Sequence, residues 1–331
     1  MYKFLTLTNL RRVVQLFAFV FMVYGALLFN TFYSNDKLTT NLPALSCAYD
    51  KQSGDYCALI PLQHQFHHRV GGIFDGDIIS SLMPTFLTLG GFIILIIILN
   101  KAFCGWMCPL GFFQEMITII GKKLKIKQIK SLDRETLKKV RPIKWFIFAF
   151  LVLIFPFLAG LGFVGHELGN PYCNICPSRI LTTLATGDIS QLYVDKSNMT
   201  LMILSLIADF LFGLMIAMAL FVRQPFCRIC PMLPLQSVFK KVGLLRLVKN
   251  GSDKCSSCSN CAKECPMDIF EITNIESNKN ITYTDCTLCG RCVEFCPHDD
   301  ILKLKYGTFD IVSSSKEAFK KRNKIEKGIY K

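Results

Sequence analysis

The runs CSSCSNCAKECP (residues 255–266) and CTLCGRCVEFCP (residues 286–297) decide the fold of the last part of the chain. Both have the spacing Cys-x2-Cys-x2-Cys-x3-Cys-Pro, which is typical of bacterial ferredoxin domains with two 4Fe-4S clusters. In such domains the first three cysteines of a run bind one cluster and the fourth binds the other. The spacing therefore predicts one cluster on Cys255, Cys258, Cys261 and Cys296, and a second on Cys286, Cys289, Cys292 and Cys265.

Two other kinds of cysteine site explain the duplicated pattern less well. A zinc site uses four ligands per ion with longer gaps between ligand pairs, and a reducing cytosol disfavours a disulfide scaffold. Between the runs, residues 267–285 alternate apolar side chains around an Asn-rich break, which is typical of short hairpins. We therefore predict a small α+β, bacterial-type 2x4Fe-4S ferredoxin domain over residues 246–305, followed by a basic tail over residues 306–331.

The residues before this domain are strongly apolar. Hydrophobic residues make up 51% of the whole chain, which includes 28 Phe. A transmembrane helix needs about 20 mostly apolar residues. Four stretches reach this length, so we predict a membrane domain of four transmembrane helices over residues 1–245, with spans near 13–32, 78–99, 145–164 and 201–222.

The first apolar stretch has a signal peptide as its alternative, because Arg11 and Arg12 precede it. The stretch is longer than the apolar core of a usual signal peptide, and no small-x-small cleavage site follows in FNTFYSND (residues 29–36). The sequence therefore favours a membrane span that is kept in the protein.

Basic residues are divided unevenly between the predicted loops. The loop 100–142 holds ten Lys and Arg, whereas the loops 34–77 and 165–199 together hold five. Lys and Arg accumulate on the cytoplasmic side of a membrane protein, so we predict a multi-pass inner-membrane protein with both termini in the cytoplasm. The net charge of +14 and the basic tail indicate contact with anionic lipid or an acidic partner. Nucleic acid is disfavoured because the chain has no recognisable nucleic-acid module.

The predicted membrane domain contains a repeated cysteine turn. FCGWMCPLGFFQ (residues 103–114) follows the second span and FCRICPMLPLQS (residues 226–237) follows the fourth, so the repeated unit is a helical hairpin that ends in a Cys-Pro turn. Two such turns facing each other would bring four thiolates together, which suits iron-sulfur or zinc. Buried structural thiols are the alternative. This inner quartet is Cys104, Cys108, Cys227 and Cys230.

Four further cysteines lie in the loops predicted to be external. An external compartment is oxidising, so these residues have three open interpretations: disulfides, a redox-active dithiol or an outer metal cluster. The outer set is Cys47 and Cys57 in the first loop, and Cys173 and Cys176 of the motif CNICP in the second.

The four spans, the paired Cys-Pro turns and the duplicated C-terminal motif together resemble the NapH family of ferredoxin-type membrane proteins. The membrane part is also similar to MauN, NosR and CcoG-like proteins. The resemblance covers nearly the whole chain and implies a quinol dehydrogenase component that carries electrons from the quinone pool towards a periplasmic reductase. It also implies redox partners such as a periplasmic ferredoxin-type or cytochrome subunit. The chain departs from the family pattern in the outer cysteines and in CRICP, where the family usually has three residues between the cysteines.

Quinone chemistry adds a requirement for protonatable groups, because a quinol loses two protons with its two electrons. Asp209 lies within the fourth span, where an ionisable residue is costly and therefore indicates a function, unless it is a hydrogen-bonded Asp that ties two helices together. A second group lies near the predicted external surface. Its members are candidates for proton release, quinone contact or haem ligation, with solvated side chains as the alternative: His64, His67, His68, His166 and Glu167.

Three functions stay open at this point. The chain is an electron-transfer subunit that takes part in quinol oxidation, a factor that reduces a metal or disulfide during cofactor assembly, or a redox-sensing membrane anchor. No nucleotide-binding glycine loop and no large soluble catalytic domain is recognisable in the sequence, which argues against a self-sufficient reductase.

Overall fold

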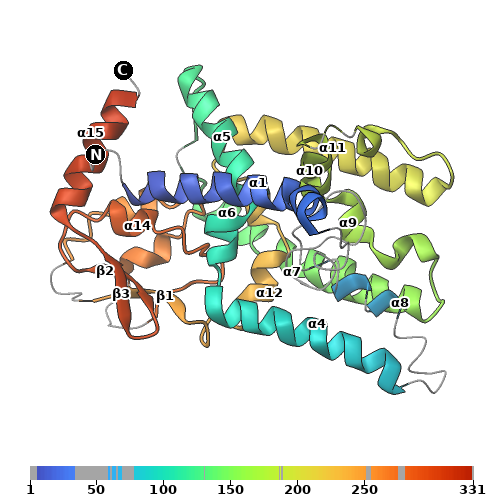
Figure 1. Ribbon diagram of the computed structural model, residues 1–331. Helices are drawn as coiled ribbons and strands as arrows, with labels where there is room; N and C mark the ends of the chain where they lie inside the picture. Colours follow the sequence, from blue (N-terminus) through green and yellow to red (C-terminus); the bar gives the residue numbers. More distant parts are fainter. Residues whose placement is uncertain are drawn as a thin grey trace.

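The chain folds into a helical part that packs against a small three-stranded sheet (Figure 1). The computed structural model describes residues 6–33, 59, 62–64, 66–68, 78–129, 131–185, 187, 189–250, 255–274 and 280–329. In these residues the helical part comprises α1 (Leu7–Tyr33), α4 (Ile78–Leu99), α5 (Pro109–Lys123), α6 (Arg134–Val140), α7 (Ile143–Ile147), α8 (Phe155–Gly160), α9 (Pro171–Ile175), α10 (Pro177–Ala185), α11 (Met199–Phe221) and α12 (Met232–Val238).

Helices occupy all four stretches that the sequence predicts to cross a membrane. In the described part of the chain, two helices are long and apolar enough to do so. One is the helical stretch Arg134–Gly160, which contains α6, α7, the π-helical segment Phe148–Ile154 and α8, and the other is α11. Leu89–Leu99 is a shorter apolar helix. The helix Arg134–Gly160 begins before the predicted span because Asp133 caps it, accepting a hydrogen bond from the backbone N–H of Glu135.

The long helices expose large apolar side chains on their outer faces. Phe86 and Ile94 of α4, Phe146 of α7 and Phe210 of α11 are each at least 60% exposed. Extended apolar surface of this kind is rare on soluble monomers and marks contact with a membrane or another protein. The exposure therefore agrees with a membrane location for these helices.

One end of each long helical segment faces the C-terminal domain that contains the three-stranded sheet, here called the sheet domain. The start of α1 contacts it through Thr8, whose backbone N–H donates to Glu294, and the start of α7 through an ion pair of Lys144 with Asp285. The ends of α4 and α11 contact it through Asn100 and Arg223, respectively. The four segments therefore alternate in direction relative to the sheet domain.

The sheet domain is built from three antiparallel strands in the order β1-β2-β3. They are β1 (Leu245–Lys249), β2 (Leu302–Tyr306) and β3 (Phe309–Ser313). Short helices α13 (Asn260–Lys263) and α14 (Arg291–Glu294) come from the two cysteine runs, and α15 (Lys316–Ile329) closes the chain. The core consists mainly of aliphatic side chains from the sheet and the cysteine loops, including Leu247, Leu304, Ile269, Leu288, Val293 and Ile301.

In its described residues, 267–274 and 280–285, the segment between the cysteine runs has no hairpin of the kind that its alternating pattern predicts. It contains a 3-10 helix, Phe270–Asn274, and one isolated bridge between Asn280 and Val248, and residues 275–279 lie outside the described part. The Nζ of Lys249 donates to the carbonyls of Ile272 and Thr273, both at 3.3 Å, so these carbonyls have partners outside a strand ladder. The hairpin of this domain is β2–β3 instead.

The residues predicted to be a basic tail are folded in their described part. Strand β3 pairs with β2 across the predicted boundary at residue 305, and α15 packs beside α14. Arg322 of α15 is only 1% exposed, lies over the Phe295 ring at 5.6 Å and donates to Asn9 of α1 at 3.5 Å. The domain therefore extends beyond residue 305, because cation-π and polar contacts bury a residue that composition alone assigns to a solvated tail.

A buried ion pair fixes α1 against α5. Arg11 Nη2 lies 2.5 Å from Glu115 Oε2, Arg12 Nε lies 2.9 Å from Glu115 Oε1, and the Arg11 side chain is 1% exposed. Burial raises the pKa of Glu115, but the charges of Arg11 and Arg12 outweigh this effect and lower it to about 2. The ionised Glu115 therefore stabilises the fold above its unfolded pKa of about 4.5, and this contribution is lost as the pH falls towards about 2.

We expect Glu115→Gln to lower the free energy of unfolding by about 3–5 kcal/mol, because it leaves the Arg11 charge buried without a full partner. The variant should also lose the acid dependence between pH about 4.5 and about 2 that the pKa of Glu115 predicts. Denaturant unfolding of the purified protein in detergent at several pH values measures both effects. Glu135→Gln, at an exposed position in α6, is the matched control. Equal stability of the two variants would contradict the role of this ion pair.

Candidate functional site

The C-terminal cysteines form two groups, and each group mixes the two runs. A small cavity of about 20 Å³ is lined by Cys286, Cys289 and Cys292 of the second run together with Cys265 of the first. Burial raises the pKa of Cys296, and the charges of the nearby Cys258 and Cys255 also act to raise it. The fourth cysteine of each run therefore lies near cysteines of the other run.

The two cysteine loops have the same local backbone shape. Positive φ angles occur at Ser257 (50°) and Ser259 (59°) in the first run, and at the corresponding Leu288 (52°) and Gly290 (75°) in the second. Left-handed residues of this kind turn successive backbone N–H groups inward and make a concave site for anionic sulfur. In the second loop, the backbone N–H of Leu288 donates to Cys286 Sγ at 3.4 Å. Both loops are thus shaped to surround a sulfur-bound group.

The first Cys-Pro turn lies directly against the second ferredoxin loop. A Cβ added at Gly105 would be 2.2 Å from the carbonyl oxygen of Thr287, so only glycine fits this contact. The neighbouring Trp106 donates from Nε1 to the carbonyl oxygen of Leu288 at 3.0 Å. The cysteines of the turn and those of the loop therefore belong to adjoining sites.

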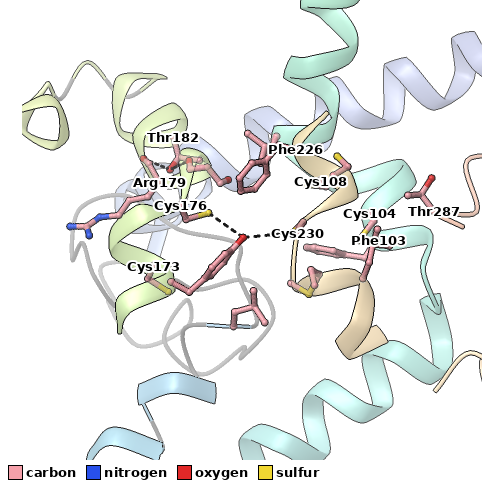
Figure 2. Close-up of a pocket in the computed structure, with 17 residues that line it drawn as sticks. Phe103, Cys104, Cys108, Cys173, Cys176, Arg179, Thr182, Phe226, Cys230 and Thr287 are labelled. Atoms are coloured by element: carbon pink, nitrogen blue, oxygen red, sulfur yellow. Dashed lines mark hydrogen bonds between the residues drawn. The ribbon is translucent and has the colours of Figure 1, made fainter. Parts of the chain in front are cut away.

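A cavity of about 80 Å³ lies behind this contact, within the helical part (Figure 2). The structure brings the whole inner quartet to this cavity, together with two cysteines predicted to lie in the external loop. The six cysteines that line it are Cys104, Cys108, Cys173, Cys176, Cys227 and Cys230. The rest of the lining is largely apolar and includes Phe103, Phe226 and Leu233.

Two glutamines that the sequence analysis did not single out connect the repeated turns. Gln114 of α5 donates from Nε2 to Cys227 Sγ at 3.5 Å, and Gln236 of α12 accepts from Cys104 Sγ at 3.2 Å. The helix after each turn therefore reaches the first cysteine of the other turn, as a pseudo-twofold arrangement requires. The signal was visible in the sequence, since both quoted motifs, FCGWMCPLGFFQ and FCRICPMLPLQS, contain a glutamine at corresponding places.

The quartet thiols are poorly suited to remain free thiolates. Burial raises the pKa of Cys108 to about 11 and that of Cys230 to about 12. For Cys104 and Cys227, burial and the charges of neighbouring thiols raise the pKa well above its ordinary value. A thiophilic metal centre would offset this cost, because metal binding favours the deprotonated thiolate.

The donor set indicates which groups the cavity could hold. Six cysteine sulfurs line it, and thiolates bind both zinc and iron-sulfur clusters. A single zinc ion would draw its sulfur ligands to about 2.3 Å. Thiols placed around an apolar cavity instead fit a cluster, in which each thiolate binds a separate iron atom. The residues at this site therefore fit an iron-sulfur group.

The four predicted histidines also come together, at the far side of the helical part from the sheet domain. His166 Nδ1 lies 2.5 Å from His67 Nε2, and the rings of His64 and His68 have centroids 4.3 Å apart. Burial, followed by the charges of the other histidines, lowers the pKa of His67 to about 4. Glu167 accepts a hydrogen bond from Asn198 at 2.6 Å. His67 is therefore neutral at pH 7. The ring nitrogens of the cluster are groups that can bind or pass on a proton.

Of the remaining predicted residues, the structure describes Asp209 alone. Asp209 is partly buried in α11, and its Oδ1 has no hydrogen-bond partner in the described structure. Cys47 and Cys57 lie outside the described residues. The other two members of the outer set, Cys173 and Cys176, line the same cavity as the inner quartet.

Comparison with family models identifies iron-sulfur domains in both parts of the chain. A model described as a 4Fe-4S binding domain matches twice, over residues 82–127 and 204–249, and a model described as a 4Fe-4S dicluster domain matches residues 247–297. The first model covers α4 with the first Cys-Pro turn and α11 with the second. The internal repeat predicted from the two turns is therefore also found by this comparison.

Similar proteins include several ferredoxin-type proteins. YccM of Escherichia coli (strain K12), whose name provisionally assigns it to electron transport, is 28% identical over 223 residues, 67% of this chain but only 56% of YccM. The ferredoxin-type protein NapH of Haemophilus influenzae is 27% identical over 223 residues, 65% of this chain and 67% of NapH. The methylamine utilization ferredoxin-type protein MauN of Methylobacillus flagellatus is 24% identical over 214 residues, 64% of this chain and 63% of MauN. No solved structure matches the chain.

Proposed function

Because the chain belongs to the NapH-type ferredoxin family, we propose that it is a membrane-bound electron-transfer protein between the quinone pool and a respiratory reductase system. The observation that supports this most is the contact of the first Cys-Pro turn with the second ferredoxin loop, at Gly105 and Trp106. This contact makes the cysteine-lined cavity and the ferredoxin motifs neighbours. Sulfur ligands thus extend from the sheet domain into the helical part.

We assign two 4Fe-4S clusters to the ferredoxin motifs and a further iron-sulfur group to the inner quartet. When bound, such clusters supply one-electron redox chemistry. The first cluster would be held by Cys255, Cys258, Cys261 and Cys296, and the second by Cys286, Cys289, Cys292 and Cys265. Burial of the sulfurs and the hydrogen bonds from Gln114 and to Gln236 would set the environment of the inner group.

The proposed quinol substrate also needs groups that accept its protons. The His67 and His166 pair is a candidate for this role, because the two ring nitrogens lie 2.5 Å apart and His67, whose pKa is lowered to about 4, would pass a proton on rather than keep it. Asp209 is a second candidate within α11, separate from the histidines. We place the histidines at the external membrane edge, where proton release would follow quinol oxidation.

The proposed orientation has both termini in the cytoplasm, with redox protein partners on the periplasmic side. It is supported by the basic loop 100–142 and by the alternating direction of the four helical segments relative to the sheet domain. A phosphatase that is active only in the periplasm should be silent when fused after Lys331 and active when inserted near Ser53. Activities in the opposite pattern would overturn the placement of every group above.

Addition of a quinol to the purified protein tests the proposed function directly. We expect anaerobic quinol to bleach the visible iron-sulfur absorbance, because the protein should accept electrons from quinol without another subunit. Dithionite serves as the control that defines full reduction. Bleaching by dithionite but not by quinol would favour the cofactor-assembly or redox-sensing alternatives.

A further inference from the structure

A third Cys-Pro turn has the same local design as the two turns of the inner quartet. Each turn ends in a cysteine that is followed directly by a proline. Cys176 of CNICP precedes Pro177, the first residue of α10, and Cys108 precedes Pro109, the first residue of α5. Cys230 likewise precedes Pro231. Backbone N–H groups at the start of the following helix lie near each of these sulfurs: those of Ser178 and Arg179 near Cys176, those of Leu110 and Gly111 near Cys108, and that of Met232 near Cys230. Three helix starts therefore present a sulfur with amide donors around it.

The chain after α8 folds back to bring this turn into the helical part. Helix α9 packs against α11 and the π-helical segment Phe148–Ile154, and α10 packs against α5 and α11 (Figure 1). Cys173 is 3% exposed and its Sγ accepts a hydrogen bond from Gln63 at 3.1 Å. A loop that the sequence places on the outer surface thus supplies Cys173 and Cys176 to the lining of the cavity.

Tyr172 links the third turn to the inner quartet. Its side chain is 3% exposed, and its hydroxyl lies 3.9 Å from Cys176 Sγ and 3.8 Å from Cys230 Sγ (Figure 2). All cysteines that the structure describes are free thiols, so Cys173 and Cys176 are not joined in a disulfide. Cys108 and Cys230 also pack in the same apolar cluster as Cys176.

We propose that Cys176 is a metal ligand in the same cavity as Cys108 and Cys230, so that three Cys-Pro turns share one thiolate-rich iron-sulfur site. This inference rests on the iron-sulfur group assigned to the inner quartet under the proposed function, and it adds a turn that the repeat does not contain. Three convergent helix starts would place amide N–H groups near their sulfurs, and the Tyr172 hydroxyl, which has a single proton, would donate a hydrogen bond to one of the two thiolates, Cys176 or Cys230. Such hydrogen bonds tune the potential of a cluster.

The test compares iron, acid-labile sulfide and visible absorbance of full-length variants purified anaerobically in detergent. Cys176→Ser should lose as much iron and sulfide as Cys108→Ser, whereas Ser190→Ala, in the same predicted external loop but not in the lining of the cavity, should retain the wild-type amount. Full iron in Cys176→Ser beside a loss in Cys108→Ser overturns the inference and leaves the quartet intact. Full iron in both variants overturns the quartet as well.

A second measurement does not remove a ligand. Tyr172→Phe keeps the ring and removes the hydroxyl that lies between Cys176 and Cys230, so it should keep its iron and shift the EPR spectrum of the cavity site. The ferredoxin signals report whether each variant is folded. An unchanged cavity spectrum in Tyr172→Phe, or a disulfide between Cys173 and Cys176 detected by thiol alkylation of the denatured protein, would count against the inference.

Discussion

Cys108→Ala and Cys230→Ala should each abolish quinol-linked electron flow, with a loss of more than about 100-fold, since even residues that only hydrogen-bond to a metal ligand change activity by about 10–100-fold. Each substitution removes one thiolate of the inner quartet, whose four sulfurs are among those that line the apolar cavity. Loss of either thiolate would leave an iron atom without its protein ligand, so the site should not assemble. Quinol-dependent bleaching of the purified variants measures the loss.

The double variant Cys108→Ala/Cys230→Ala separates a shared site from independent thiols. Residues of one site give strongly non-additive effects, so the double variant should be no worse than either single variant. Structural thiols would instead give small losses of stability that add. Met107→Leu, in the same turn, is the matched control and should retain electron flow and ferredoxin signals. Normal flow in either single variant would reduce the quartet to packing.

The second large effect concerns ligation across the two ferredoxin runs. Cys265 lines the same small cavity as Cys286, Cys289 and Cys292, although it belongs to the other run. Cys265→Ser should therefore destroy the cluster held by the second run and largely spare the one held by Cys255, Cys258 and Cys261. EPR of the reduced protein, which distinguishes the two clusters, measures which signal disappears.

Cys255→Ser is the matched control for this prediction. It lies in the same run as Cys265, yet it should remove the other cluster. If Cys265→Ser and Cys255→Ser removed the same EPR signal, each run would hold its own cluster and ligation across the runs would be wrong.

Local spacing predicts the parts of this molecule that local chemistry determines. The duplicated cysteine runs predict the ferredoxin domain, and a family model finds a dicluster domain at residues 247–297. Hydropathy predicts a helix in each of the four apolar stretches, because a helix that crosses a bilayer needs about 20 mostly apolar residues. The structure has helices in all four. The resemblance to the NapH family is confirmed by the similar proteins.

Long-range contacts account for the features that the sequence did not predict. The motif CNICP reads as part of an external loop because nothing in residues 165–199 signals that α9 and α10 fold back against α5 and α11. The basic residues of α15 read as a solvated tail, yet Arg322 is buried over Phe295. The alternating pattern of residues 267–285 predicts strands, but Lys249 binds two of its carbonyls in a helical turn. Each of these outcomes depends on residues far away in the chain.

The iron and acid-labile sulfide content of the purified protein, with EPR of the reduced sample, tests most directly whether the cavity carries an iron-sulfur group. Two 4Fe-4S clusters alone account for about eight iron atoms per chain. We predict clearly more than about eight, with an additional EPR signal that disappears in Cys108→Ser. A content of about eight iron atoms with only the two ferredoxin signals would contradict the account and leave the ferredoxin domain as the only redox centre.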